Sequence, residues 1–286
     1  PRGMSSAASD VYKRQGRLST KPIGSQIVDY GCQYINPKFS ITSRLVSNLK
    51  SLGLLNEIHF NKNKRVFISP FGMNKIPQYL SRKTRVLSNT FVNTISSKEN
   101  GWEVYTDAGI FSSSSVVLTM PIAQVETLLK KSEIENFDLP KVDYLDFHTC
   151  TFTSDKQSIE DVFSKNESFP WICNNSKKGL RNNENSFTTN VNNDITQRLK
   201  DLSTEQKLEI VEGLLNSSGF ENIKGLNVHY WRYAFADNQD NPDYFFDQST
   251  GLGVCGDSFS MGKVDGAIKS AELLFFQLFN YLNNNY

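Results

Sequence analysis

Apolar residues recur at helical spacing in several stretches of the chain. Within 41–53 they are separated by four, four and three positions, which places them on one face of a helix that ends near Gly53. Ser203 followed by Gln206 has the pattern of a capping box and predicts that a helix begins there. Pro121 suits the start of another helix. The longest periodic stretch is apolar enough to form helix core, and we do not expect a membrane anchor. The strongest helix predictions cover 41–53, 73–80, 204–215 and 266–282.

Other stretches have the patterning of strands. Residues 116–120 form a continuous apolar run, typical of a strand buried on both faces of a parallel sheet. The sequence Glu99-Asn100-Gly101 predicts a hairpin turn. Residues 174–193 are rich in Asn and short of core residues, which predicts a surface loop or a sheet edge. We predict further strands over 65–70, 91–95, 102–105, 137–145, 148–153, 228–234 and 251–256. Helices and strands that alternate in this way indicate an α/β fold.

Composition narrows the classes of function. The chain has 286 residues, enough for one large domain or two interleaved ones, and 38% are hydrophobic. Lys and Arg number 31 against 30 Asp and Glu, so nothing favours nucleic acid or an anionic membrane as a partner. No apolar run approaches the ~20 residues of a membrane span, and no signal peptide opens the chain, so we expect a cytoplasmic protein.

The Cys and His residues are scattered along the sequence. The four Cys residues form no C-x-x-C pair, and the three His residues show no metal-ligand spacing. We therefore expect reduced, buried thiols and no metal site.

The first fifteen residues stand apart from the rest. The tail of this segment, 10–15, looks like the in-frame translation of a transposase adapter used in sequencing libraries. We set 1–15 aside as an adapter artefact, with an ordinary N-terminus as the alternative. Natural sequence is then expected to begin near Gly16.

The most informative stretch is 251–267, GLGVCGDSFSMGKVDGA. It combines a strand, a Gly-Asp pair, a Gly-rich loop and a helix start. Asp257 at the strand end is placed to accept hydrogen bonds from ribityl or ribose hydroxyls. Gly262 and Gly266 let the backbone approach a flat ring closely. The helix start offers unpaired N–H groups and a positive dipole end. The stretch therefore predicts a site for a polar, ring-containing cofactor.

This segment resembles the C-terminal flavin motif of renalase-like and amine-oxidase-like FAD enzymes. Four other stretches agree, in family order from Gly16 to the C-terminus. They are 16–20, similar to the end of a G-G-R-x-S-T loop; 29–34, similar to D-H-G-A-Q-Y-F; 91–92, where the family has an adenine-binding strand; and 116–124, similar to V-V-L-x-x-P-x-x-Q.

The resemblance implies a set of cofactor residues. Arg17 would neutralise the FAD pyrophosphate, and Val92 would hold the adenine through its main chain. Asp257 would bind the ribityl chain, with Lys263 beside it and Val264 offering its N–H to the pyrimidine edge. The residues expected to line FAD are Gly16, Arg17, Gly31, Gln33, Tyr34, Val92, Gly256, Asp257, Gly262, Lys263 and Val264, and those expected to wall the substrate are Trp231 and Tyr233.

Departures from the family are equally specific. The family's G-x-G-x-x-G segment is missing before Gly16, so we expect a Rossmann-like FAD/NAD(P)-binding domain that lacks its first β-α-β segment. Lys263 replaces the usual Arg, Tyr30 replaces His and Cys32 replaces Ala. Cys255 is not in a covalent-flavin context, which implies dissociable FAD. The expected FAD-binding domain comprises 16–36, 71–125 and 246–286, interleaved with a mixed-sheet substrate domain of 37–70 and 126–245.

The function implied is hydride transfer from a reduced organic substrate to FAD, with O2 as the final acceptor. The substrate would be a dihydronicotinamide nucleotide isomer or, second, a small amine, and no catalytic residue is identified. Two alternatives remain open: a non-catalytic fragment that does not bind FAD, and a serine hydrolase that uses Ser258. Simpler interpretations also stand for three features, namely a solvated Arg17, a turn-capping Asp29, and core packing by Trp231 and Tyr233.

Overall fold

The chain folds into two compact units. The computed structural model describes residues 16–61, 64–135, 137–155, 162–181, 184–237 and 241–285. Unit 1 contains the described residues up to Asn36, with 44–86 and 146–234; unit 2 contains 37–43, 87–145 and 235–285. Each unit combines helices and strands, so the predicted α/β class is confirmed in its coarse form, a mixed α/β protein.

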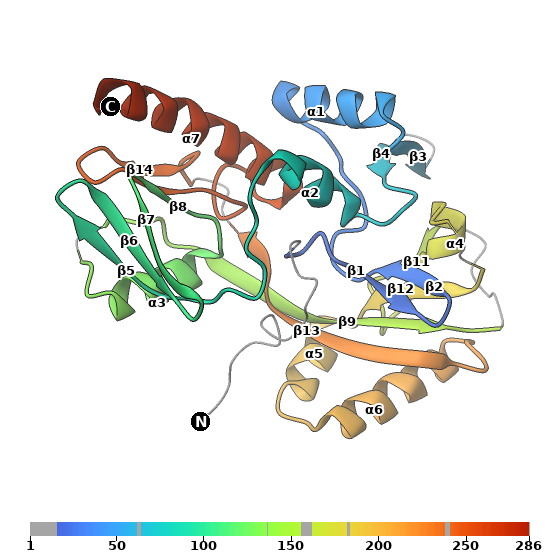
Figure 1. Ribbon diagram of the computed structural model, residues 1–286. Helices are drawn as coiled ribbons and strands as arrows, with labels where there is room; N and C mark the ends of the chain where they lie inside the picture. The colour runs from blue at the N-terminus through green and yellow to red at the C-terminus, as the bar shows by residue number, and fades with distance from the viewer. Residues whose placement is uncertain are drawn as a thin grey trace. The chain divides into compact units, whose positions relative to one another are not determined.

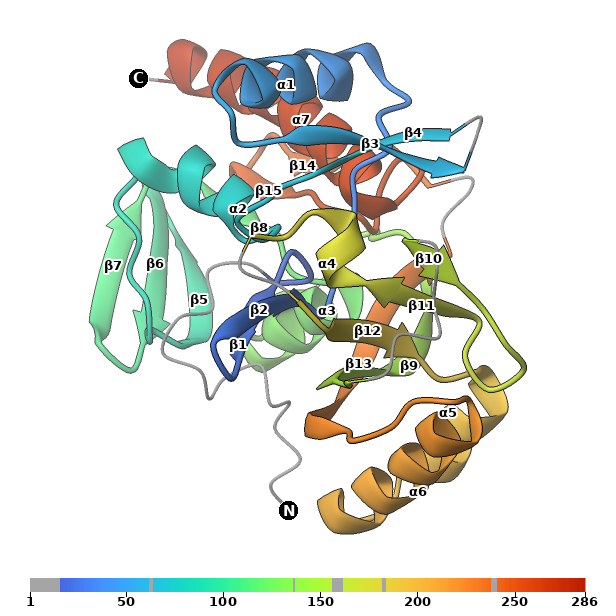
Figure 2. The same cartoon turned by 90° about the vertical axis from the view of Figure 1, so that its right-hand side faces the viewer.

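Unit 1 is built on a five-stranded sheet with the order β10-β11-β12-β9-β13. Two helices cover one of its faces, α5 (Asn193–Leu199) and α6 (Thr204–Ser217), as Figures 1 and 2 show. The predicted capping box is present at the start of α6, where the side chains of Ser203 and Gln206 each bond the other's backbone. The strands are β9 (Asp143–Thr153), β10 (Phe163–Ser164), β11 (Trp171–Asn174), β12 (Ser186–Asn190) and β13 (Lys224–Asp237).

The sheet's two faces follow from strand alternation. We call the face that α5 and α6 cover the helix face; its central strands contribute His148, Cys150, Phe152 and Phe187, and the last three belong to the hydrophobic core. We call the opposite face the hairpin face; its central strands contribute Thr149, Thr151, Thr188 and Asn190, all buried.

A hairpin covers this second face. It consists of β1 (Thr20–Ile23) and β2 (Gln26–Asp29), and β2 packs against β12. The prediction that 174–193 is a surface loop or sheet edge is therefore wrong. This stretch contains the short helix α4 (Asn175–Lys178) and β12, which is an interior strand of the sheet. Its polar residues are buried because the hairpin lies over them.

The rest of unit 1 is a second hairpin with three helical segments. The predicted strand near 65–70 is confirmed as β4 (Lys64–Ile68), and it pairs with an unpredicted strand, β3 (Asn56–Asn61). The predicted helices are confirmed as α1 (Ser40–Ser51), which begins in unit 2, and α2 (Lys75–Leu80), followed by the 3-10 turn η2 (Ser81–Lys83).

Unit 2 contains the strands predicted at 116–120 and 251–256, and the structure pairs them in parallel. In its three-stranded sheet, β15 (Leu252–Val254) runs parallel to β8 (Val116–Leu118) and antiparallel to β14 (Phe245–Asp247). The C-terminal helix α7 (Lys263–Asn285) packs on β14 and β15, as Figure 1 shows. Gly253 permits this packing, since a Cβ there would lie 3.0 Å from Leu274 Cδ2.

The same unit contains an antiparallel meander. It comprises β5 (Val92–Lys98), β6 (Gly101–Thr106) and β7 (Gly109–Ser113), with helix α3 (Ile122–Lys131) packed on β5. The hairpin predicted at 99–101 is confirmed, whereas β7 was not predicted.

Two expectations for unit 2 are corrected. β8 is not buried on both faces, because Val117 is 38% exposed. Of the predicted strand 137–145, only 143–145 is a strand. It forms one continuous strand, β9, with the stretch predicted at 148–153. On α7, Leu274 of the predicted apolar face is buried, whereas Phe275, Phe276 and Phe279 are more than half exposed. Within the described residues, no helix has both the length and the apolar character needed to cross a membrane.

Candidate functional site

The predicted cofactor loop of unit 2 has an unusual backbone. Gly256, directly after β15, has a φ of +144°, and Gly262 has a φ of +64°. Ser260 and Lys263 also have positive φ values, of 53° and 61°, although they carry side chains. Such conformations persist only where the surroundings hold them, and they cluster at functional sites. Gly266 is also required, because a Cβ there would lie 3.2 Å from the backbone of Met261.

Side chains on neighbouring segments hold this loop in place. The Ser258 hydroxyl shares a 2.6 Å hydrogen bond with the Tyr144 hydroxyl. Ser260 Oγ donates to Asp243 Oδ1 at 2.6 Å, and Lys269 Nζ donates to the same oxygen at 2.6 Å. Partial burial opposes ionisation of Asp243, but these two donors outweigh it and lower the pKa of the carboxyl. The loop is therefore tied by side chains to Tyr144, Asp243 and helix α7 of the same unit.

The start of α7 presents donors beside the loop. The N–H of Val264 lies in the first helical turn, where no intrahelical acceptor exists. The carboxylate of Asp265 does not cap this end, since it accepts from the backbone N–H groups of Lys38 and Phe39. Lys263 is exposed, with Nζ 5.3 Å from the Phe235 ring centre. Together with the half-buried carboxylate of Asp257, these groups form a polar, glycine-lined edge that offers both hydrogen-bond donors and an acceptor.

Val92, the predicted adenine contact, lies at the start of β5. Its side chain is 36% exposed, and it pairs with Thr106 in the meander.

Unit 1 brings three other predicted residues together. Gly31 packs on the backbone of Arg17, where a Cβ would lie 2.0 Å from Arg17 O. The N–H of Cys32 donates to that same oxygen at 2.6 Å. Arg17 Nη1 in turn donates to Tyr233 O at 2.8 Å on β13. The glycine is thus required by the close approach of two protein segments, and the neighbouring Gly16 has a φ of +46°.

The predicted substrate wall packs within unit 1. The ring of Trp231 stacks on that of Tyr30 with 5.4 Å between centroids, and Trp231 Nε1 donates to Tyr30 O at 3.2 Å. His229 meets Trp231 edge-on at 4.4 Å. Tyr34 makes an edge contact with Phe163 at 5.8 Å. The contacts of Tyr30 and His229 with Trp231 lie at β13, whereas that of Tyr34 lies at β10, at the other edge of the sheet.

Sequence reasoning missed a buried ion pair beside this group. Lys178 Nζ lies 2.6 Å from Asp29 Oδ2 and 3.2 Å from Gln33 Oε1, and both charged side chains are 0% exposed. Lys178 stands in the Asn-rich stretch that we assigned to the surface. One local signal was present: the apolar run Trp171-Ile172-Cys173 directly precedes Asn174, whose side chain caps α4 by accepting from Lys177 N.

The cysteines are inert thiols. All four are free; Cys150, Cys173 and Cys255 are buried as expected, whereas Cys32 is only half-buried. Desolvation raises the pKa of Cys32 and Cys255 to about 11 and that of Cys150 and Cys173 to about 12. None is a thiolate near neutral pH, so none is an activated nucleophile.

The geometry also disfavours Ser258 as a hydrolytic nucleophile. Its side chain is buried, and its hydroxyl is paired with Tyr144. All three His residues of the sequence belong to unit 1, so unit 2 supplies no imidazole base to Ser258. A nucleophilic Ser requires such a base within hydrogen-bond reach.

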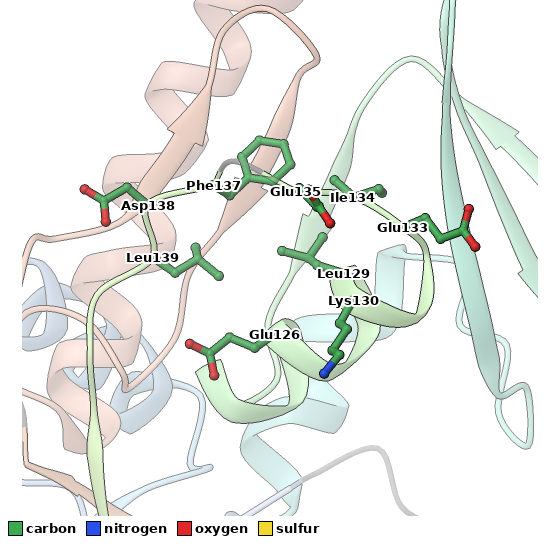
Figure 3. A pocket seen from close by; sticks show the side chains of 9 residues that line it. All are labelled: Glu126, Leu129, Lys130, Glu133, Ile134, Glu135, Phe137, Asp138 and Leu139. Carbon is green, nitrogen blue, oxygen red and sulfur yellow. The ribbon is translucent and has the colours of Figure 1, made fainter.

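A separate groove lies at the C-terminal end of α3. Its volume is about 570 Å³, and Figure 3 shows the side chains of Leu129, Leu139 and Glu126 around it. None of the predicted cofactor or substrate residues lines this groove.

Comparisons with known proteins support the fold. No protein-family model matches the sequence, and no curated protein gives a significant match. A solved structure described as a protoporphyrinogen oxidase from Exiguobacterium sp. 255-15 matches with a TM-score of 0.57 at 14% identity, over 77% of this chain and 53% of its own. A double mutant of putrescine oxidase, from a redesign of cofactor binding, matches with a TM-score of 0.53 at 14% identity, over 76% of this chain and 54% of its own. This chain spans about half the length of each structure, and the likeness shows a shared fold.

Proposed function

We propose that this chain binds FAD non-covalently and belongs to an oxidoreductase of the renalase and amine-oxidase type. The observation that carries the proposal is the loop 256–266, with its left-handed backbone positions and the donor-bearing start of α7. The shared fold with two oxidases supports it, as does the family-ordered set of motifs in the sequence.

Different residues contact different parts of the cofactor in this proposal. Asp257 accepts hydrogen bonds from the ribityl hydroxyls, and the N–H of Val264 donates to the pyrimidine edge. Gly256 and Gly262 keep the backbone close to the ring because no side chain intervenes. Arg17, Gly31, Gln33 and Tyr34 are the proposed contacts from unit 1, and Val92 is the proposed adenine contact. Bound FAD supplies a two-electron acceptor.

The proposed substrate is a dihydronicotinamide nucleotide isomer, with a small amine as second choice and O2 as the final acceptor. A dihydronicotinamide donates hydride without a general base, which suits a chain whose described thiols are protonated and whose Ser258 is buried. The work of the protein is then to orient the substrate over the ring and to exclude water. Because this chain spans about half of each matched structure, the alternative that it does not bind FAD by itself is tested first.

The test is an FAD titration of the purified chain, followed by absorbance and flavin fluorescence. We expect saturable binding with shifted absorbance bands, and an affinity about tenfold or more weaker in Asp257→Ala, since charge-assisted hydrogen bonds are lost. The matched control is Asp138→Ala, an exposed carboxylate of unit 2 in the separate groove, which should bind like the wild type. A folded wild-type chain that shows no saturable change in FAD absorbance or fluorescence would overturn the proposal.

A further inference from the structure

The buried ion pair of unit 1 organises the segment 29–34. Gln33 connects Lys178 to the segment that follows Asp29. Its Oε1 accepts from Lys178 Nζ at 3.2 Å, and its Nε2 donates to Asp29 O at 2.7 Å and to Gly31 O at 3.1 Å. Lys178 therefore contacts the chain on both sides of the bend at Gly31. It bonds the Asp29 side chain directly, and through Gln33 it reaches the carbonyl groups of Asp29 and Gly31.

The remaining atoms of Asp29 are also committed. Oδ1 accepts from Thr20 Oγ1 and from Met73 N, and the main-chain oxygen accepts from Thr188 Oγ1 at 2.9 Å. Only Oδ2 faces Lys178. Through its carboxylate, Asp29 joins the 29–34 segment to the hairpin and to the start of α2, and through its main-chain oxygen it joins the segment to strand β12.

Stability alone does not account for such a pair. Replacing a buried ion pair by apolar residues of similar volume is often neutral or stabilising, because desolvation offsets the attraction between the charges. What the pair supplies is a defined geometry for the groups that it bonds. Those groups belong to the segment 29–34, which contains Gly31, Gln33 and Tyr34.

We propose that Lys178 is a positioning residue for FAD binding, which holds the 29–34 segment in its binding conformation through Asp29 and Gln33. This rests on the proposed function, because the flavin-lining role of Gly31, Gln33 and Tyr34 is part of it. Lys178 acts through these residues: its side chain is 0% exposed and its ammonium group is bonded to Asp29 and Gln33.

The decisive variant is the pair Asp29→Asn with Lys178→Met. Asn keeps the oxygen that Thr20 and Met73 use, while Met fills the space of the Lys stem, so no buried charge is left without a partner. Lys178→Met alone leaves the buried Asp29 carboxylate without its cationic partner, and we expect that protein to unfold more easily. Lys177→Met is the matched control, since the neighbouring Lys is exposed.

Two readouts are measured on the full chain. The first is amide hydrogen exchange of the 29–34 segment without cofactor, with 171–174 in β11 as internal reference. The second is FAD affinity with the absorbance bands of the bound flavin. For the double variant we expect exchange of 29–34 to accelerate by about tenfold or more, with 171–174 unchanged, and FAD affinity to fall by a similar factor. Lys177→Met should behave like the wild type in both.

The outcomes separate the two proposals. Unchanged exchange in 29–34 would overturn the positioning role whatever the affinity does. Faster exchange with unchanged FAD affinity would overturn the link to the cofactor and leave the proposed function standing. A wild-type chain that binds no FAD would overturn the proposed function, and the positioning role with it. If the double variant does not fold, Gln33→Leu keeps the ion pair and removes the bridge, and it should accelerate exchange in the same segment.

Discussion

The two faces of the five-stranded sheet in unit 1 are buried to a similar degree but by different means. On the helix face, Phe152 and Phe187 stack at 5.4 Å and pack with Val211 and Leu215 of α6. On the hairpin face, Thr151 and Thr188 are paired across the same two strands and are both 0% exposed. One face is a hydrocarbon core, and the other is a buried polar network.

The cost of burial differs between the faces. Burial of apolar groups lowers the free energy of the folded state. Burial of polar groups raises it unless they form hydrogen bonds. The hairpin face does not satisfy all of its groups: among the described residues, Thr151 Oγ1 has no hydrogen-bond partner, and neither has Oδ1 of Asn175, the α4 residue that bonds Thr188. The helix face therefore stabilises unit 1, while the hairpin face positions the segment 16–34, where five of the candidate cofactor residues lie.

The largest effect is expected for Phe152→Ala on the helix face. Phe152 is 0% exposed and also meets Phe220 edge-on at 4.9 Å, so the truncation leaves a cavity in the centre of the core. We expect the free energy of unfolding to fall by about 3–5 kcal/mol, measured by urea denaturation. Leu52→Ala, at a half-exposed position of unit 1, is the control and should cost much less. Equal losses would mean that the helix face is not the core of the unit.

The next effect concerns the one imidazole on the helix face. His148 is 1% exposed, neither ring nitrogen has a partner among the described residues, and its ring lies 4.9 Å from that of Tyr230. Burial, aided by Lys207 and Lys200 and opposed by Asp146, lowers the pKa of His148 from 6.5 to about 4. The folded protein thus holds a neutral imidazole that the unfolded chain protonates more readily.

Stability should therefore be full above pH 6.5 and decline as the pH falls toward 4. For this group alone we expect a loss of about 2 kcal/mol between pH 7 and pH 5, and His148→Leu should remove that part of the pH dependence. The measurement is urea denaturation of both proteins at the two pH values. The same decline in both would assign the pH dependence to other groups.

The contrast between the faces also shows why sequence reasoning succeeded in some places and failed in others. Helix α6 was predictable because the capping box and the apolar stripe are local patterns. Strand β8 was predictable as a strand of a parallel sheet from its continuous apolar run, although its partner β15 was not identified as such. Strand β12 was not, because Phe187 is its only apolar residue and the residues that bury its polar side chains lie about 150 positions earlier.

The candidate site also contains residues that a local sequence pattern identifies and residues that only long-range contacts explain. The loop 256–266 is contiguous, so its glycines and Asp257 could be recognised together as a cofactor motif. Lys178 could not be recognised, because it is charged, lies among Asn residues and is explained only by Asp29, 149 positions away. Gly31 was assigned a cofactor role from the motif, yet its local requirement is contact with the Arg17 backbone, which no sequence pattern records.

The smallest effect is expected for Thr188→Val on the hairpin face. The Thr188 hydroxyl donates to Asp29 O at 2.9 Å and accepts from Asn175 Nδ2 at 3.0 Å, so Val keeps the shape and removes both bonds. We expect a loss of about 1 kcal/mol, because a hydrogen-bonded hydroxyl contributes little net stability while its former partners lose their bond in a dry site. Thr153→Val is the matched control: its hydroxyl bonds Lys224 O where water can replace it, so it should be nearly neutral. If both variants lose the same stability, water reaches Thr188 as well, and the hairpin face is not the dry network that distinguishes it from ordinary polar surface.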